Sequence, residues 1–188
     1  DALAAAPLAK LKNAPILFSA QAGLTLSTQN ELQRLGVNKV YLVTGRSIFD
    51  QTLYEQLETL KITVLHLGGS DRFQTTVNIA RELGTPPEVV ITTAWKNADA
   101  LSMASIAAAK GIPILLSDAE RLPVSVSAYL NEIKGSLRQS YIIGGEQAVG
   151  SSVQNLLSKG VRIGGHDRFA TNIEILSPEL CKVKTPFS

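Results

Sequence analysis

The sequence predicts an α/β fold made of tandem small Rossmann-like units, with parallel sheets and helices on both faces. Short apolar runs alternate with helical patterns along the chain, which indicates strand–helix–strand units. The runs are apolar nearly throughout, as expected of parallel strands that are buried on both faces. The chain also repeats itself, so the same unit is expected more than once.

The internal repeat has a period close to 100 residues, which suits one small α/β unit and is too long for a solenoid. Three pairs of segments match, and ten of the nineteen positions of the first pair are identical: Asp1–Ser19 with Asp99–Ser117, Tyr41–Gly45 with Tyr141–Gly145, and Gly68–Ile79 with Gly164–Ile175. This register predicts the later part of a first unit, a complete second unit, the start of a third unit and an unassigned tail, over residues 1–67, 68–163, 164–176 and 177–188. Because Asp1 stands where a helix begins, with no initiator Met or signal peptide before it, we expect a piece of a longer or processed protein.

Seven strands and eight helices are expected in alternation. The strands are the short apolar runs Pro15–Ser19, Val40–Val43, Thr63–Leu67, Val89–Thr93, Ile112–Ser117, Ser140–Ile143 and Val161–Ile163. The helices are the segments Ala2–Lys12, Ser27–Leu35, Ile48–Leu60, Arg72–Leu83, Ala100–Lys110, Val124–Ile133, Val149–Ser158 and Arg168–Leu176. The clearest boundaries belong to the helix after Asp99, because Asp99 can cap its N-terminus and Gly111 and Pro113 follow its end.

Three of these helices carry expectations about packing. The helices over 2–12 and 100–110 are rich in alanine, and methyl side chains allow close approach, so we expect them to pack the units together. The high helix propensity of alanine explains the same composition equally well. The helix over 168–176 repeats one that the first unit lacks, and we expect it to cover residues 1–67 or to pack on another chain.

Composition and charge narrow the class of protein. Hydrophobic residues make up 45% and charged residues 18%, which is typical of a globular chain. A net charge of +2 permits an anionic partner, but the chain lacks the dense Lys/Arg clusters of a duplex-DNA binder, so no nucleic acid is expected. No apolar run reaches the length of a transmembrane helix, so no membrane insertion is expected. Cys181, His66 and His166 offer neither an internal disulfide nor metal-ligand spacing, and no metal or cofactor is expected.

Glycines stand just after several of the expected strands: Gly68, Gly69, Gly144, Gly145, Gly164 and Gly165, with Gly45 at the matching place in the first unit. Their backbone N–H groups could receive an anionic group such as a phosphate at the start of the following helix. The alternative is a tight strand-to-helix turn, for which glycine is well suited. No segment spells GxGxxG or GxxxxGK[ST], so a nucleotide fingerprint is absent from the sequence.

An Asp-Arg-Phe motif follows two of the glycine pairs, with Asp71 and Arg72 in one copy and Asp167 and Arg168 in the other. Aspartate is a natural N-cap. Arginine then lies in the first helical turn, where the helix dipole disfavours a cation, so a carboxylate or an external anion is expected to compensate it. The planar guanidinium suits phosphate and carboxylate. A structural salt bridge to another unit is the alternative.

A third motif, around Asn97 and Asp99, follows the strand Val89–Thr93 through Trp95. It is expected at the carboxyl edge of a parallel sheet, where ligands of open α/β folds bind. Asp99 and its counterpart Asp1 are expected to cap helices and to position the neighbouring loops rather than to touch an anion. Trp95 is the single tryptophan, and it could stack on a sugar ring or fill the seam between units. No local spacing favours a catalytic constellation, so the chain is not expected to be an enzyme.

Taken together, these residues resemble the cell wall binding repeat 2 family. The segments that carry the resemblance occur twice in order: Asp1–Ala5 and Asp99–Met103, Ala14–Leu17 and Ile112–Leu115, Tyr41–Gly45 and Tyr141–Gly145, and Gly68–Phe73 and Gly164–Phe169. The resemblance implies small Toprim-like units, often packed in threes. It also implies a non-catalytic module that anchors a secreted Gram-positive protein at the cell wall, non-covalently, on an anionic polymer such as a teichoic acid. Thr44 stands where the second unit has Gly144, which departs from the glycine pair.

Two other functions fit the same sequence. One is a structural module that mediates self-association, as in a surface layer, with the chain as a homo-oligomer. The other is a Rossmann-type enzyme that handles a nucleotide or a sugar, which the missing glycine fingerprint disfavours.

Overall fold

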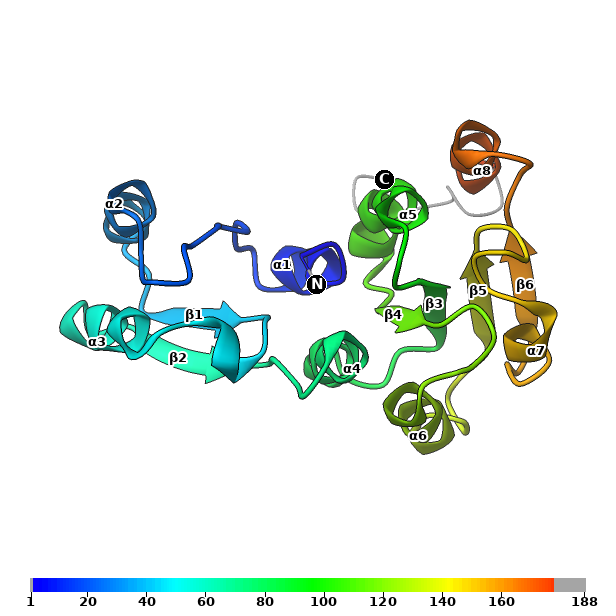
Figure 1. The fold of residues 1–188 in the computed structure, drawn as a ribbon, viewed down its shortest axis with the longest axis horizontal. Helices are drawn as coiled ribbons and strands as arrows, with labels where there is room; N and C mark the ends of the chain where they lie inside the picture. Colours follow the sequence, from blue (N-terminus) through cyan, green and yellow to red (C-terminus); the bar gives the residue numbers. More distant parts are fainter. Residues whose placement is uncertain (1, 178–188) are drawn as a thin grey trace, which may run out of the picture.

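Two parallel sheets, one in each repeat unit, form the framework of the computed structural model (Figure 1), which describes residues 2–177. In the first unit, β1 (Lys39–Leu42) pairs with β2 (Thr63–His66). In the second unit the strand order is β4-β3-β5-β6, with β3 at Glu88–Thr93, β4 at Ile114–Ser117, β5 at Gln139–Ile143 and β6 at Gly160–Ile163. Every pairing in both sheets is parallel, which confirms the predicted α/β class.

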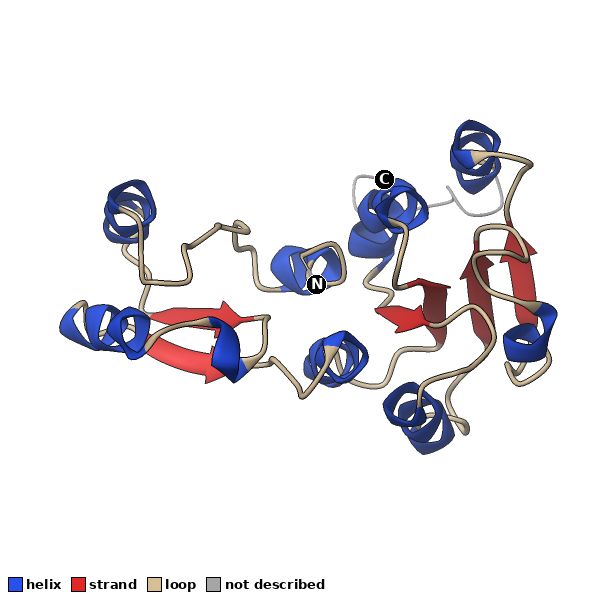
Figure 2. Cartoon of the chain, in the orientation of Figure 1, coloured by secondary structure: helices blue, strands red, loops and turns tan. Residues whose placement is uncertain are grey.

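Helices cover both faces of the four-stranded sheet (Figure 2). Along β3, Val89 and Ile91 face a core shared with α4 (Arg72–Glu82), α6 (Val124–Glu132) and α7 (Ser151–Gln154). Val90, between them, faces the opposite core, which is shared with α5 (Asn97–Lys110) and α8 (Arg168–Ile175). This alternation explains why the strand reads as continuously apolar, since side chains of both orientations are buried.

The alanine-rich helices join the two units. In the first unit, α1 (Ala6–Leu11) packs against α5, and Ala4 and Ala5 just before it are buried in the same core as Ala104 and Ala107. Small side chains allow this close approach of two helices. The expectation that these helices pack the units together is confirmed. The rest of the first unit has its own smaller core, to which α2 (Leu26–Arg34) and α3 (Gln51–Thr59) contribute. The short 3-10 helix η1 (Arg46–Ile48) has no buried residue.

The strand expected at Pro15–Ser19 does not form, and this prediction was wrong. The segment is extended and unpaired, and Phe18 is 81% exposed. Its counterpart in the second unit, β4, is held by hydrogen bonds to β3. Among residues 2–177, the first unit has no strand equivalent to β3, so the segment has no neighbour to pair with. An apolar run without a partner strand cannot satisfy its backbone groups in a sheet.

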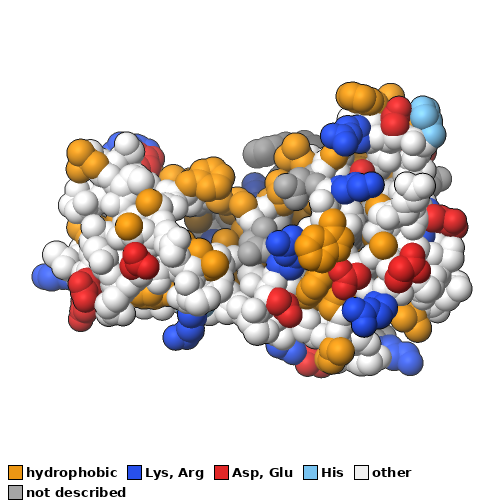
Figure 3. Space-filling model, viewed as in Figure 1, with side chains coloured by type: hydrophobic (Ala, Val, Ile, Leu, Met, Phe, Trp, Pro, Cys, Tyr) orange, Lys and Arg blue, Asp and Glu red, His pale blue; other side chains and the backbone are white. Residues whose placement is uncertain are grey.

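The sequence predicted that α8 covers residues 1–67 or packs on another chain. In the structure α8 does not cover the first unit of the same chain. It packs on α5 and β6 of the second unit, with Ile175 fully buried and Ile173 70% exposed. In α4, which is the counterpart of α8, Val77 and Phe73 contact the core of the second unit. The equivalent residues of α8 are Ile173 and Phe169. The same face of α8 is therefore left open, and hydrophobic side chains are visible at that end of the molecule (Figure 3).

Several helices are shorter than predicted, most of all those expected over 2–12 and 149–158, which span only Ala6–Leu11 and Ser151–Gln154. The start of α5 is the most informative difference. The helix α5 begins at Asn97, with Lys96 at the N-cap position and no side-chain cap, so Asp99 lies in the first turn and is not the cap. Its end is as predicted, because Gly111 adopts the left-handed conformation at φ 70°. None of the helices within residues 2–177 is long and apolar enough to span a membrane.

Candidate functional site

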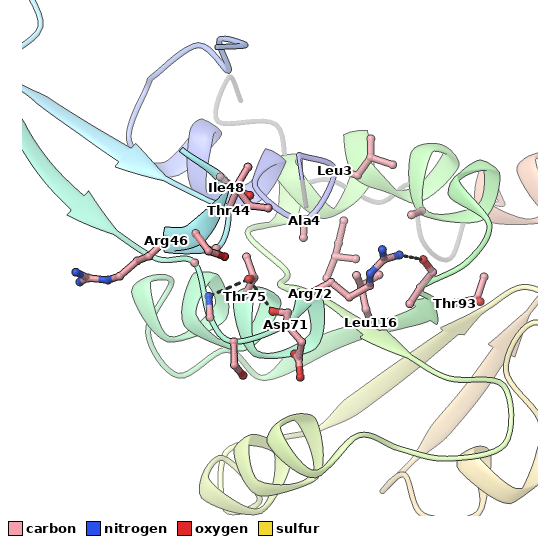
Figure 4. Close-up of a pocket in the computed structure, with 18 residues that line it drawn as sticks. Leu3, Ala4, Thr44, Arg46, Ile48, Asp71, Arg72, Thr75, Thr93 and Leu116 are labelled. Atoms are coloured by element: carbon pink, nitrogen blue, oxygen red, sulfur yellow. Dashed lines mark hydrogen bonds between the residues drawn. The ribbon is translucent and has the colours of Figure 1, made fainter. Parts of the chain in front are cut away.

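A pocket of about 820 Å³ lies at the seam between the two units (Figure 4). The first unit contributes the loop 44–48, which follows β1, together with Leu3 and Ala4. The second unit contributes residues 68–72 and the carboxyl ends of β3 and β4. All these strand ends point toward the same region, and open α/β folds bind ligands at such edges. The pocket is thus lined by residues of both units.

The glycine pairs serve the close approach of backbone segments. A Cβ atom on Gly68 would lie 1.7 Å from the carbonyl oxygen of Thr44, and one on Gly164 would lie 2.6 Å from the carbonyl carbon of Gly144. The amide of the second glycine already has a partner, since Gly69 donates to the Thr75 hydroxyl at 3.0 Å and Gly165 to that of Thr171 at 3.1 Å. These contacts fit the strand-to-helix turn that the sequence offered as the alternative to anion binding. Gly145 has open space where a Cβ would stand.

The aspartates of the Asp-Arg-Phe motif are helix caps. The Asp71 carboxylate accepts the Gln74 amide at 2.7 Å, and that of Asp167 accepts the Ala170 amide at 2.8 Å. The Ala170 amide hydrogen bond is the main reason that the pKa of Asp167 lies below its usual value. Capping was the role expected of these residues, and the structure confirms it.

The arginine of the first motif is held over the single tryptophan. The Arg72 guanidinium donates through Nη1 to the carbonyl oxygen of Ala94 at 2.9 Å and lies 4.8 Å from the centre of the Trp95 ring. Neither contact neutralises its charge, and within residues 2–177 Arg72 has no ion pair. The compensation expected for a cation at a helix start is therefore only partial. Arg72 lines the seam pocket (Figure 4) and stays exposed.

The second arginine lies in a more acidic environment. Arg168 is exposed and is near enough to the buried Asp99 for its charge to act on that carboxylate. Burial nevertheless raises the pKa of Asp99 above its usual value, against the lowering effects of Lys96 and Arg168. A Cβ atom on Gly144 would lie 2.7 Å from Asp99 Oδ2, so glycine at this position makes room for the carboxylate. Asp99 lies beside the loop that follows β5, and its role in positioning that loop stays a prediction.

Two predicted site residues cannot be placed in full. Asp1 lies outside the described residues, as does Cys181, and the side chain of Asn97 is not described. The expectation that Asp1 and Asn97 position loops remains a prediction. Among the described residues, no cluster of three or more His, Cys, Asp or Glu side chains could hold a metal ion.

The sequence reading missed Arg46, which occupies the rim of the seam pocket. It is exposed on η1, it has no ion pair or hydrogen bond within residues 2–177, and its guanidinium is directed away from Arg72 (Figure 4). Its counterpart in the second unit is Glu146, five positions after Tyr141 as Arg46 is five after Tyr41. The repeat alignment already shows that an arginine in the first unit is replaced by a glutamate in the second. This difference distinguishes the first seam, between the first and second units, from the second seam, between the second unit and residues 164–176.

These features define a tandem α/β module with a pocket, lined by Arg46, Asp71 and Arg72 among others, where two units meet. The family model described as Cell wall binding domain 2 (CWB2) matches residues 1–54 and 66–154, which is most of the chain. The chain therefore belongs to the cell wall binding domain 2 family, and it is a cell-wall-binding module.

Two curated proteins of Bacillus subtilis (strain 168) are similar to the chain. The N-acetylmuramoyl-L-alanine amidase LytC is 30% identical over 175 residues, which cover 92% of this chain and 35% of that protein. The amidase enhancer is 30% identical over 179 residues, which cover 94% of this chain and 24% of that protein. The chain thus spans about a third or less of the length of these relatives.

Two solved structures have the same fold. Cwp8 from Clostridium difficile gives a TM-score of 0.82 at 31% identity, over 93% of this chain and 31% of that chain. Cwp6 from the same organism gives 0.84 at 28% identity, over 92% of this chain and 29% of that chain. The arrangement of elements in the two units is therefore shared with other cell wall proteins.

Proposed function

We propose that the chain anchors its parent protein on the outside of the cell by binding an anionic wall polymer, such as a teichoic acid, in the seam pocket. The contact is non-covalent and reversible. Arg46 and Arg72 supply the positive charge, from opposite units, and the pocket between them admits the anionic group.

The observation that carries this proposal is the lack of compensation for these two arginines. Two exposed arginines elsewhere in the described residues do have carboxylate partners, Arg34 in Glu31 and Arg81 in Glu132. Arg46 and Arg72 have no carboxylate partner within residues 2–177 and lie at one pocket. A guanidinium binds phosphate or carboxylate through two parallel hydrogen bonds, so an external anion fits the position.

The two seams are not equivalent in this proposal. At the second seam Glu146 replaces Arg46 and accepts a hydrogen bond from Ser151. Arg168 also shares that region with the carboxylate of Asp99. The first seam is thus the principal anion site, and Arg168 makes a weaker secondary contact. A second contact on the same polymer adds strength because it is intramolecular.

Paired substitutions test the assignment. Replacing Arg46 and Arg72 with Gln should weaken retention on Gram-positive wall sacculi by roughly 5- to 30-fold, since each exposed charge contact contributes about 0.5–1 kcal/mol. Retention of the wild type should also fall as salt rises, because exposed charges are screened beyond about 8 Å near physiological ionic strength.

Lys134→Gln with Arg138→Gln is the matched control, because both residues are exposed and precede β5, at the amino edge of the sheet. This pair removes the same net charge and should leave retention nearly unchanged. Equal losses for the two pairs would show that net charge, and not the seam pocket, governs binding. Circular dichroism confirms that each variant is folded.

Self-association is the second candidate function, and the open face of α8 favours it. Phe169 and Ile173 are exposed, whereas the equivalent side chains of α4 contact the core of the second unit. A further unit or a second copy could cover this face, which would agree with units packed in threes. The mass in solution without polymer distinguishes a module that assembles by itself from one that only binds the wall.

A further inference from the structure

Trp95 is an exposed aromatic side chain that is nevertheless held in one place. Its side chain is 63% exposed. The indole Nε1 donates to Asp118 Oδ1 at 2.9 Å, and Arg72 lies over the ring. Phe73 meets the ring edge-to-face, with centroids 6.5 Å apart and an interplanar angle of 79°. Three neighbours thus fix a ring that contributes little buried surface to the fold.

The position of Trp95 links it to the seam pocket. It follows directly after β3, at the carboxyl edge of the sheet, and its neighbours Ala94 and Arg72 both line the pocket. Acidic and basic side chains alternate with hydrophobic ones over this unit (Figure 3). Arg72 lies over the Trp95 ring, and Asp118 accepts a hydrogen bond from its Nε1. Hydrogen-bond donors and an acceptor therefore lie next to an exposed aromatic surface.

We propose that Trp95 is a stacking platform for a pyranose ring of the wall polymer, adjacent to the anionic group that the pocket receives. This inference rests on the proposed function and specifies the ligand as a glycopolymer rather than a simple polyanion. The apolar C–H face of a sugar packs on the negative face of the indole. Asp118 and Arg72 act as positioning residues for the ring, and their remaining hydrogen-bonding capacity suits the sugar hydroxyl groups.

Because Trp95 is the single tryptophan, its fluorescence reports on the platform directly. The probe is the soluble polymer that muramidase digestion releases from Gram-positive sacculi. Stacking should change the emission in a saturable way as this polymer is added. Trp95→Leu should weaken binding of the polymer roughly tenfold, the scale of an aromatic contact. Trp95→Tyr, which keeps an aromatic face, should recover most of the affinity.

Leu101→Ala is the matched control, since Leu101 is also 63% exposed but lies within α5 and offers no aromatic surface; this variant should bind as the wild type does. Wild-type retention on sacculi with unchanged emission, or a folded Trp95→Tyr variant as weak as Trp95→Leu, would overturn the platform and leave the proposed function standing. Wild type that is not retained on sacculi would overturn both. If Trp95→Leu does not fold, the wild-type emission and Trp95→Tyr decide the question in the same way.

Discussion

His66 and Arg162 occupy equivalent places at the ends of β2 and β6, two residues before the first glycine of each pair. Arg162 donates to the carbonyl oxygens of Gly144 at 2.8 Å and Val149 at 2.7 Å, and so ties the loop after β5 to the sheet. Both ring nitrogens of His66 are buried without a hydrogen-bond partner. The loop that carries Arg46 therefore lacks the equivalent hydrogen bonds to its sheet. In the second unit the arginine is on strand β6, whereas in the first unit it is on η1, at the rim of the pocket.

This difference predicts a pH dependence of stability. Burial, and then the nearby charge of Arg46, lowers the pKa of His66 below its usual value. The unfolded chain then binds the proton more readily than the folded chain, so protonation favours unfolding. The free energy of unfolding should decline as the pH falls below about 6.5 and should be fully recovered above it.

Urea unfolding between pH 7.5 and pH 5 measures this effect. His66→Leu should flatten the decline in that range. His166→Gln is the control, because the His166 side chain is 86% exposed, and it should leave the decline as in the wild type. A decline that persists unchanged in His66→Leu would assign it to other groups.

At the scale of residues, the sequence predicted the roles that depend only on neighbouring positions in the chain. Asp71 and Asp167 cap their helices as the motif indicated, because an N-cap depends only on the next three residues. The partners of Arg72 could not be predicted in this way, since Ala94 and Trp95 are reached through the tertiary fold. The partners of the glycine amides were not predicted either, although they are local: Gly69 and Gly165 donate to the hydroxyl groups of Thr75 and Thr171, six residues further along the chain.

At the scale of elements, the repeat provides a comparison between a strand and the same segment without its partner. Leu115 of β4 is 0% exposed, whereas Leu17, at the equivalent position of Pro15–Ser19, is 39% exposed. Local pattern predicted a strand at both places, and pairing with β3 decided which of them formed one. An apolar run thus indicates a possible strand, and the presence of a neighbour determines the outcome.

The pair predicts unequal costs for one substitution. Leu115→Ala should lower the free energy of unfolding by about 2–5 kcal/mol, because it leaves a cavity in a closed core. Leu17→Ala should cost below about 1 kcal/mol, as expected of a partly solvated site. Chemical denaturation of both variants measures the difference. Equal costs would mean that residues 15–19 are packed as tightly as β4.

On the scale of the whole molecule, the period of the repeat predicted part of a first unit, a complete second unit and the start of a third, and this division of the chain stays a prediction. It did not predict how they meet, because the seam depends on side chains from both units. The alanine content of two helices did indicate the contact between the units, because α1 and α5 pack against each other at the junction. The seam pocket lies at this junction and is lined by Arg46 of one unit and Arg72 of the other.

The central claim, that this module binds an anionic wall polymer, is tested most directly by co-sedimentation with purified Gram-positive sacculi before and after removal of their anionic polymers. The charge of the seam predicts that the protein sediments with untreated sacculi and stays in solution with stripped ones. Equal sedimentation with both preparations would contradict the account, because the ligand would then be the peptidoglycan itself.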